Sequence, residues 1–411
     1  MTMTQRTLYK TIEKIGLIDY ASEEEMLIAI LREFVSNDRI NIIGGRIWQL
    51  RQETRTYRLV YEQGTIEEVG VGFEIALKDY EVFDQVARSR TVLADETNRT
   101  LRKKGIKRYS ATGMGGTVRI GRTAYYEYLM AFNTVVSDEE LRYTMNIVAQ
   151  AVTQLLERRR SEAEKRILEN ELEHAAELQR QILPAHEYQF GRYELYGISM
   201  PERTVGGDFF NYYTTPGDSD RLGVAVGDAA SKGFPAAVQA LFVSGALMMS
   251  VEYESKISSA IRRINTINRK IFPDDRLLSL FYCELFDVKD GLLLYANAGH
   301  PAPIHYHAAT RSCSSLTVTG PIIGLLPDAT FTVAGINLAK NDILLLYTDG
   351  ITEANNGSEE YGEQRLADML AARADKPAKT ICAEIVQDAQ IFGTHGVYAD
   401  DKTVVVIKRL R

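Results

Sequence analysis

The amino-acid sequence predicts a mixed α+β fold in three parts: an N-terminal α/β domain, a helical linker and a C-terminal β-sandwich flanked by helices. Three patterns along the 411 residues predict it. Residues 1–140 alternate between strand-like runs and amphipathic helical patterns, residues 141–184 are helical throughout, and residues 185–411 carry apolar strand-like runs with helices between them. This length is sufficient for two or three domains with buried cores.

The first part begins with a well-marked helix. Ser22-Glu-Glu-Glu25 has the spacing of a capping box. The apolar residues that follow recur on one helical face: Met26, Leu27, Ile30, Leu31 and Phe34. Strands are then expected at 40–50, 57–61, 118–120 and 125–136, a helix at 80–87, and a short extended segment at 91–95.

This order of elements resembles a GAF sensory domain over about residues 15–155. The resemblance implies a pocket for a small ligand beside the sheet, and the ligand is unknown. The first cysteine is Cys283 and the first histidine is His174, so neither a thiol-attached chromophore nor a histidine-ligated haem is expected. Gly113-Met-Gly-Gly116 is interpreted as a plain turn rather than a phosphate loop. A dimerisation module without a ligand is the alternative.

Residues 137–183 show a helical pattern with two apolar seams. The steps of four and three in the first seam are typical of a coiled coil: Leu141, Met145, Val148, Val152 and Leu155. The second seam has a shifted phase: Leu168, Leu172, Ala175 and Ile182. Pro184 ends the helix. We expect a parallel dimeric linker, and a single amphipathic helix lying on its own domain is the alternative.

The composition excludes several classes of protein. A net charge of −7 argues against a dedicated nucleic-acid binder. The three cysteines are scattered without a CxxC pair, which fits a reducing compartment. Residues 1–10 are polar, and no apolar run approaches the ~20 residues that a membrane span needs. We therefore expect a cytoplasmic protein without a membrane span.

Four aspartates lie at the ends of strand-like runs: Asp208, Asp228, Asp349 and Asp400. A β-hairpin that starts after Asp208 and returns to Asp228 through the turn-rich residues 215–220 would bring these two carboxylates together. The local pattern places all four at one edge of one sheet. Converging carboxylates tolerate one another only when protons or hard cations neutralise them. Because aspartate is also a common turn residue, spacing alone leaves a plain-turn interpretation open.

Five motifs in the same region carry a family resemblance. They are Val205–Phe210 (VGGDFF), Val226–Ala237 (VGDAASKGFPAA), Asn297–Pro303 (NAGHPAP), Tyr347–Glu353 (YTDGITE) and Asp400–Thr403 (DDKT). Together they resemble the SpoIIE/RsbU branch of the metal-dependent PPM (type 2C) serine/threonine phosphatases. The Leu178–Pro184 segment (LQRQILP) is similar to the linker of that branch. The resemblance covers about residues 178–408.

The resemblance implies a two-metal centre that holds Mn²⁺ or Mg²⁺. Asp228 would bridge both ions, with the Ala229 carbonyl completing one site. Asp349 and Asp400 would bind the other ion, and Asp208 would support the centre directly or through water. Carboxylate and carbonyl oxygens suit hard divalent ions, and two metals ~3.5–4 Å apart lower the pKa of a bridging water. Asp228 and Asp208 are therefore the candidate catalytic residues, and hydroxide would attack phosphorus in line without a covalent enzyme intermediate.

Other candidate residues have simpler expected roles. No cysteine is followed by an arginine six positions later, which excludes a cysteine-nucleophile phosphatase. His300 is expected to form structural hydrogen bonds, whereas His305 and His307 are expected at the surface of a strand. Ser231 stands where the family usually has glycine, and serine would strain the loop if its φ is positive. Arg203 is a weak candidate for binding the substrate phosphate.

The resemblance implies a GAF-regulated protein serine/threonine phosphatase in a parallel homodimer. Its substrate would be a phosphorylated STAS-domain anti-sigma-factor antagonist or a similar partner-switching protein. The helices expected at about 235–249 and 257–271 would act as a switch that completes the metal site. Two alternatives stay open at this point: a non-catalytic module that binds and sequesters its partner, and a small-molecule phosphohydrolase.

Overall fold

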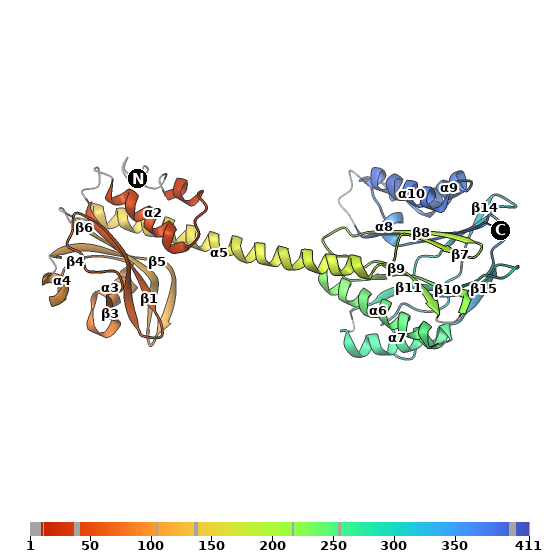
Figure 1. Cartoon of the computed structure of the whole chain (residues 1–411), viewed down its shortest axis with the longest axis horizontal. Helices are drawn as coiled ribbons and strands as arrows, with labels where there is room; N and C mark the ends of the chain where they lie inside the picture. Colours follow the sequence, from red (N-terminus) through yellow and green to blue (C-terminus); the bar gives the residue numbers. More distant parts are fainter. Residues whose placement is uncertain are drawn as a thin grey trace. The chain divides into compact units, whose positions relative to one another are not determined.

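The computed structural model describes residues 10, 12–36, 42–103, 106–134, 139–215, 218–253, 256–273, 275–393 and 400–410. They divide into two compact units, Met1–Ile167 and Leu168–Arg411, whose elements are labelled in Figure 1. Both units combine helices with antiparallel sheets. The prediction of a mixed α+β chain is therefore confirmed.

The N-terminal unit is built on a six-stranded antiparallel sheet in the order β3-β2-β1-β6-β5-β4. Its strands are β1 (Ile42–Arg51), β2 (Thr56–Gly64), β3 (Glu74–Ala76), β4 (Thr91–Asp95), β5 (Arg108–Ile120) and β6 (Thr123–Thr134). Its helices are α2 (Glu23–Val35), η1 (Leu77–Asp79), α3 (Val82–Ser89), α4 (Arg99–Lys103) and the start of α5 (Glu139–Ile182). Helices α2 and α5 pack on one face of the sheet, and α3 and α4 pack on the other.

Helix α2 forms where the sequence predicts it. The Ser22 hydroxyl accepts a hydrogen bond from the backbone N–H of Glu25 at 3.1 Å, and the Glu25 carboxylate accepts one from the N–H of Ala21 at 3.0 Å. This reciprocal arrangement is a capping box. All of the predicted apolar face is buried: Met26, Leu27, Ile30, Leu31 and Phe34. The predicted start and inward face of the helix are both confirmed.

The predicted turn at residues 113–116 is wrong. These residues lie within β5, whose pairing with β6 shifts register between Met114 and Thr117. Gly115 has a φ of +77°, which glycine adopts readily. Glycines favour both turns and β-bulges, and here they mark a bulge inside a long strand.

The first apolar seam of α5 attaches this helix to the N-terminal unit. Met145, Val148 and Val152 are buried in a core shared with α2 and the sheet. This seam therefore does not form the expected dimeric coiled coil. It follows the alternative, an amphipathic helix that packs on its own domain. A heptad pattern shows that one face is covered, but it does not distinguish a partner chain from the chain's own domain.

Charged side chains hold α5 at the edge of the same unit. The Arg160 guanidinium pairs with the carboxylate of Glu23 at 2.6 Å and with that of Glu127 at 2.8 Å. The hydrogen bond from Arg160 is the main cause that lowers the pKa of Glu23. Arg159 donates a hydrogen bond to the carbonyl oxygen of Tyr20 at 2.7 Å. The arginine run therefore fastens the helix beside the N-terminus of α2.

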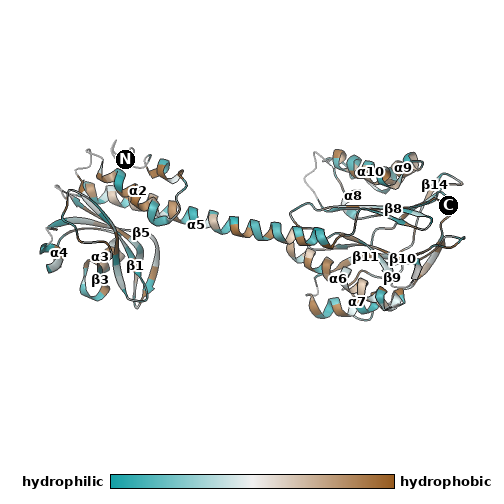
Figure 2. Ribbon diagram, in the orientation of Figure 1, coloured by the Kyte–Doolittle hydropathy of each residue, from teal (hydrophilic) through white to brown (hydrophobic). Residues whose placement is uncertain are grey.

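The middle of α5 is exposed to solvent. Every residue from 161 to 170 is exposed, and Figure 2 shows this stretch as mostly hydrophilic with isolated apolar residues. Leu168 is 57 % exposed and Leu178 is 60 % exposed. The second predicted seam is therefore open to solvent at Leu168.

The C-terminal unit is a sandwich of two antiparallel sheets. The five-stranded sheet has the order β15-β12-β11-β10-β9, and the six-stranded sheet has the order β14-β13-β16-β17-β8-β7. The five strands are β9 (Phe209–Thr215), β10 (Asp218–Ala229), β11 (Leu278–Phe286), β12 (Leu292–Ala298) and β15 (Ala334–Asn337). The six strands are β7 (Glu187–Phe190), β8 (Tyr193–Met200), β13 (Ile304–His307), β14 (Ser312–Ser315), β16 (Ile343–Tyr347) and β17 (Lys402–Arg409).

Helices cover both outer faces of this sandwich (Figure 1). Helices α6 (Phe234–Glu252) and α7 (Ile257–Ile271) pack on the five-stranded sheet, and α9 (Glu363–Arg373) and α10 (Ala378–Phe392) pack on the six-stranded sheet. Apolar side chains such as Val224, Phe281 and Val405 fill the space between the sheets. This is the predicted β-sandwich flanked by helices, with α10 as an element that the sequence pattern did not reveal.

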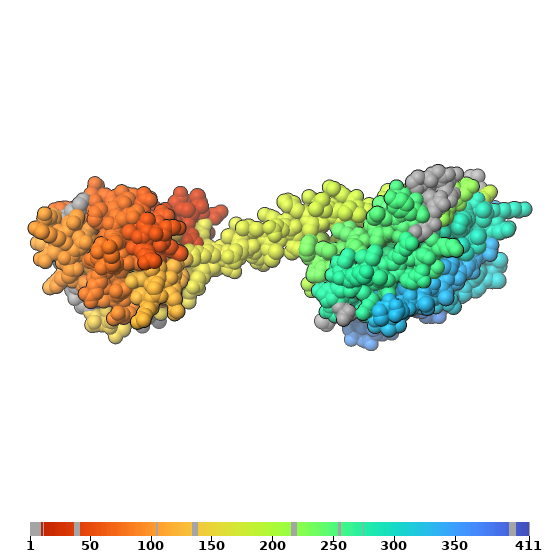
Figure 3. Space-filling view, turned by 90° about the horizontal axis from the view of Figure 1, so that it is seen from below, coloured from red at the N-terminus to blue at the C-terminus, as the bar shows by residue number. Residues whose placement is uncertain are grey.

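Helix α6 is apolar on most of its surface. Among the described residues it is the one helix long and apolar enough to cross a membrane by length and composition. Its inner face is buried at Ala240, Val243 and Leu247 in the core above the five-stranded sheet, which is typical of a core helix. Met248 and Met249 of this helix are exposed, and the green of this part of the chain is visible on the face shown in Figure 3.

Candidate metal centre

The four predicted aspartates come from strand ends of both sheets. Asp208 precedes β9 and Asp228 lies near the end of β10, and the register of this hairpin sets them side by side. Residues 216 and 217 of the predicted hairpin turn lie outside the described residues. Asp349 follows β16 and Asp400 precedes β17, and these two strands are antiparallel neighbours in the six-stranded sheet. The expectation of one edge of one sheet is therefore wrong, because local pattern shows where a strand ends but not which sheet it joins.

A pocket of about 590 Å³ opens where these strand ends meet. Asp228, Asp349 and Asp400 line it together with Ala229. Asp349 begins the short helix α8 (Asp349–Thr352) rather than a turn. Of the residues predicted to bind metal, only Asp208 is absent from the described lining of this pocket.

Asp208 lies behind the lining of the pocket. It is 3 % exposed, and the Thr348 hydroxyl donates a hydrogen bond to its Oδ2 at 2.6 Å. The same hydroxyl accepts a hydrogen bond from the backbone N–H of Thr403 at 2.9 Å. Burial, and then the neighbouring carboxylate of Asp228, raises the pKa of Asp208 well above its usual range. These contacts indicate a supporting position.

Like charges are concentrated in the pocket. Burial raises the pKa of Asp228 to about 7, and the carboxylates of Asp349 and Asp400 act in the same direction, against a hydrogen bond with Asp208. Burial, followed by the charge of Asp400, also raises the pKa of Asp349. Desolvated carboxylates in this arrangement need protons or cations to neutralise them at neutral pH.

Asp401 organises the loop that leads to Asp208. Its carboxylate accepts hydrogen bonds from the backbone N–H groups of Glu202 at 2.7 Å, Gly207 at 2.6 Å and Asp208 at 3.4 Å. Asp401 is not among the residues predicted to bind metal. Its place directly after Asp400 in the DDKT motif is the signal that could have identified it.

Two glycines allow the loops of the centre to approach closely. A Cβ atom added to Gly350 would lie 2.0 Å from the carbonyl oxygen of Asp401, and one added to Gly207 would lie 3.0 Å from the carbonyl oxygen of Ala229. A side chain at Gly350 would therefore force apart the loops that present Asp349 and Asp400.

Ser231 does not strain its loop. It is not among the described residues with positive φ, whereas Gly233 has a φ of +73° and caps the start of α6. The strain expected for a serine with positive φ therefore does not arise. The Ser231 hydroxyl is buried without a hydrogen-bond partner among the described residues, and Ser231 lines the pocket. A bound polar group would satisfy this hydroxyl.

His300 has the structural contacts that the sequence predicts. It is 2 % exposed, its Nδ1 lies 2.8 Å from the Ser279 hydroxyl, and its backbone N–H donates to Asn297 at 2.8 Å. Burial lowers the pKa of His300 to about 3, so the ring is neutral at physiological pH. Arg203 is exposed and is not part of the described pocket lining, so the structure gives it no contact with the centre.

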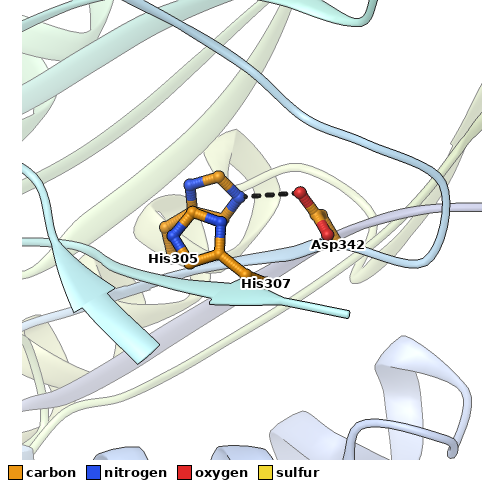
Figure 4. Close-up of side chains that lie close together, drawn as sticks. All are labelled: His305, His307 and Asp342. Carbon is orange, nitrogen blue, oxygen red and sulfur yellow. Dashed lines mark hydrogen bonds and ion pairs between the residues drawn. The ribbon is translucent and has the colours of Figure 1, made fainter. Parts of the chain in front are cut away.

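A second group of ligand-type side chains lies on the six-stranded sheet (Figure 4). His305 Nε2 is 3.0 Å from Asp342 Oδ2, and the rings of His305 and His307 are 3.9 Å apart. His305 is 4 % exposed, so the expected surface position is wrong for it. Asp342 also accepts hydrogen bonds from the backbone N–H groups of Ala308 and Ala339. Three donors satisfy this carboxylate, and hydrogen bonding accounts for the group.

The donor set of the pocket suits hard divalent cations. Among the described residues, His305, His307 and Asp342 form the group whose three ligand atoms lie within 4.8 Å of one another. No three pocket aspartates in this part of the chain meet that distance, so their carboxylates are spread more widely. A centre for two ions ~3.5–4 Å apart spreads its ligands over a wider span than a one-ion site. Carboxylate and carbonyl oxygens are the ligands that Mg²⁺ and Mn²⁺ prefer. Metal binding by the predicted residues stays a prediction.

Comparisons with known proteins point to one family. Residues 218–410 match the family model described as Stage II sporulation protein E (SpoIIE). The chain is 28 % identical over 267 residues to Protein IcfG of Synechocystis sp. (strain ATCC 27184 / PCC 6803 / Kazusa), which covers 58 % of this chain and 41 % of IcfG. It is 24 % identical over 246 residues to Phosphoserine phosphatase RsbU of Bacillus subtilis (strain 168), which covers 59 % of this chain and 71 % of RsbU.

A solved structure has the same fold. The SiaA-PP2C domain of Pseudomonas aeruginosa matches with a TM-score of 0.52 and 20 % identity, over 60 % of this chain and 98 % of that one. At this identity the likeness shows the fold alone. The chain spans less than half the length of IcfG.

Proposed function

We propose that this chain, in which residues 218–410 form a SpoIIE-type domain of the PPM phosphatases, is a metal-dependent protein serine/threonine phosphatase. The observation that carries the proposal is the convergence of Asp228, Asp349 and Asp400 on one pocket. The name of the RsbU relative, a phosphoserine phosphatase, supports a phosphorylated side chain as the substrate.

The pocket residues would divide the binding of metal between them. Two divalent cations, Mn²⁺ or Mg²⁺, supply a water of lowered pKa and neutralise charge on the reacting phosphate. Asp228 would bridge the two ions, with the Ala229 carbonyl completing one site. Asp349 and Asp400 would hold the other ion. This assignment uses the three carboxylates that line the pocket, and the cations would neutralise their mutual repulsion.

The residues behind the pocket would hold these ligands in place. Asp208 neighbours Asp228 and takes the hydrogen bond from Thr348 at 2.6 Å. Asp401 fixes the preceding loop through three backbone N–H groups. Because His300 is buried and neutral, its contribution is to position Ser279 rather than to carry a proton.

The proposed substrate is a phosphorylated STAS-domain anti-sigma-factor antagonist or a similar partner-switching protein. This proposal is supported by the family resemblance and by the RsbU relative. The two alternative functions are a non-catalytic module that sequesters its partner and a small-molecule phosphohydrolase. The carboxylates of the pocket favour catalysis, because a sequestering module has no need of buried like charges.

The test is phosphate release from a phosphoserine peptide in the presence of Mn²⁺. We expect release that EDTA abolishes. Tight binding of the peptide without release would support the sequestering module instead. A panel of phosphorylated metabolites, assayed with the same metal, tests for a small-molecule phosphohydrolase. Such an enzyme would hydrolyse one of the metabolites far faster than the peptide.

We further propose that the N-terminal unit is a GAF-like sensor. Its six-stranded sheet with helices on both faces supports the resemblance. A cavity of about 40 Å³ lies inside it, beside the buried Arg46 and Glu96. That volume holds water rather than a ligand, so a ligand bound in this cavity would have to enlarge it.

The proposed parallel homodimer would form along the second seam of α5. Leu168 is exposed at a position that a coiled coil would bury. We expect Leu168→Cys to form an intermolecular disulfide under mild oxidation. Asn170→Cys places its thiol on the opposite side of the helix and should form far less of this disulfide. Non-reducing electrophoresis measures both. Equal crosslinking of the two variants, or none in either, would argue against the dimeric linker.

The end of α5 is joined directly to the loop before Asp208. Gln179 is buried, its side-chain amide donates to the carbonyl oxygen of Gly206 at 2.7 Å, and its side-chain carbonyl accepts from the N–H of Gly206 at 3.3 Å. Ala176 packs beside Val205 in the same contact. A movement of this helix would therefore reach the metal centre through Gln179.

Gln179→Leu is expected to weaken Mn²⁺ binding by about tenfold. The substitution leaves both backbone groups of Gly206 buried without their partner, at a cost of roughly 1–3 kcal/mol. The loop before Asp208 then leaves its position more easily, and Mn²⁺ binding would have to restore it; an extra cost of about 1.4 kcal/mol in the bound state corresponds to tenfold in affinity. Titration calorimetry measures the affinity. Gln181→Leu is the control, because Gln181 is exposed on the same helix. Equal Mn²⁺ affinity for the two variants would show that the contact does not influence the centre.

A further inference from the structure

One basic side chain reaches the pocket of the metal centre. Among the described residues that line it, Lys232 is the one with a permanent positive charge, since His300 is neutral. The Lys232 ammonium lies 3.1 Å from Asp400 Oδ2 and 3.7 Å from Glu202 Oε2, and the side chain is 41 % exposed. It therefore stands at the mouth of the pocket, partly in solvent, beside a proposed metal ligand.

The loop that carries Lys232 is held from both sides. It begins at the end of β10, where the N–H of Ala230 donates to the carbonyl oxygen of Leu277 at 3.0 Å. It ends at Gly233, whose positive φ starts α6. The first turn of α6 contains no acidic residue, so the positive end of the helix is not neutralised there. The backbone thus fixes where Lys232 leaves the loop, and its ion-paired side chain extends from there to the mouth of the pocket.

A charge count shows why a cation is needed here. Three pocket carboxylates and two divalent cations together leave one positive charge. A phosphomonoester is close to a dianion at neutral pH, so the complex would carry one negative charge in a partly desolvated site. An ammonium group within reach neutralises it and also offers three hydrogen-bond donors.

We propose that Lys232 binds the phosphate group of the substrate. This inference rests on the proposed phosphatase function. The Lys232 ammonium pairs with Asp400. A cation that shared the charge of Asp400 would weaken this pairing and let the ammonium turn to the phosphoryl oxygens. The buried Ser231 hydroxyl, which lines the same pocket without a partner among the described residues, is placed to donate a second hydrogen bond.

The test measures binding of inorganic phosphate to the Mn²⁺-loaded protein by titration calorimetry. Lys232→Met is expected to raise the phosphate Kd by about ten- to a hundredfold, the range for a hydrogen bond to a charged group. Lys232→Arg keeps the positive charge and is expected to lose far less affinity for phosphate. Lys289→Met is the control, because Lys289 is exposed outside the pocket. In peptide hydrolysis, Lys232→Met should raise KM more than it lowers kcat.

A second readout separates this role from simple charge neutralisation. Affinity for Mn²⁺ alone is expected to change little in Lys232→Met. If Mn²⁺ affinity changes while phosphate affinity does not, Lys232 is only a counter-ion of Asp400 and the proposal is overturned. Should Lys232→Met fail to fold in a thermal melt, Lys232→Gln replaces it with the same expectations.

The two proposals fail in different ways. A wild-type protein that binds phosphate through Lys232 but hydrolyses no phosphoserine peptide would overturn the phosphatase function alone. A wild-type protein that hydrolyses the peptide, with phosphate affinity unchanged in Lys232→Met, would overturn the role of Lys232 alone.

Discussion

Asp228→Asn is expected to reduce Mn²⁺-dependent phosphate release by about a thousandfold or more while the protein stays folded. Asp228 lines the pocket and has four carboxylate neighbours: Asp208, Asp349, Asp400 and Asp401. As the proposed bridging ligand it would hold both ions, and an amide cannot bridge two cations with the same charge. Losing several kcal/mol of transition-state stabilisation corresponds to at least this factor.

The same substitution should make the metal-free protein more stable, which distinguishes a lost ligand from a damaged fold. An amide at position 228 removes a buried charge that repels Asp349 and Asp400. Thermal melts in EDTA measure this effect, and calorimetry with Mn²⁺ measures the lost affinity. Asp328→Asn, at an exposed site outside the pocket, is the control. Substantial Mn²⁺-dependent activity in Asp228→Asn would rule out the ligand assignment.

The second large effect is a pH dependence of stability that metal reverses. Burial and neighbouring carboxylates raise the pKa of Asp228 from 3.8 to about 7. A carboxyl group with a raised pKa binds protons more strongly in the folded than in the unfolded state. The contribution of Asp228 to the free energy of unfolding is therefore fully present below about pH 4 and is lost as the pH rises through about 7. The size is on the order of a few kcal/mol, because each pH unit of difference corresponds to about 1.4 kcal/mol.

Unfolding in urea at several pH values, in EDTA and in Mn²⁺, tests this dependence. Other groups titrate in the same range, so the informative quantity is the difference between the wild type and Asp228→Asn. In EDTA the wild type should lose stability relative to the variant between about pH 4 and pH 7. In Mn²⁺ the wild type should gain stability relative to Asp228→Asn as the pH rises, because cations and protons compete for the same carboxylates. A difference that does not change with pH would contradict the proposed state of Asp228.

Local patterns in the sequence predicted the elements better than their partners. The capping box at Ser22 placed α2, and the turn-rich residues after β9 placed the hairpin between Asp208 and Asp228. These features depend on residues a few positions apart. Which sheet β17 joins, and whether Val148 packs on its own domain or on another chain, depends on surfaces distant in sequence. Periodicity shows that a face is covered but not by what.

The candidate site followed the same division. The aspartates were visible because strand ends and motifs mark them in the sequence. The roles of Thr348, Asp401 and Lys232 were not visible, because each of the three acts through a contact with a residue 140 or more positions away in the sequence. A motif can mark such a polar residue, as DDKT marks Asp401, but the tertiary structure is needed to show which residue it contacts.

Helix α5 is fastened by different chemistry at its two attachments. Arg160 holds it to Glu23 and Glu127 through partly exposed ion pairs, whereas Gln179 holds it to Gly206 through a buried, uncharged amide pair. Salt screens exposed charges over about 8–10 Å at physiological ionic strength, but it has little influence on buried amides. A rise in ionic strength would therefore weaken the contacts of Arg160 with the N-terminal unit and leave the contact between Gln179 and Gly206 in place.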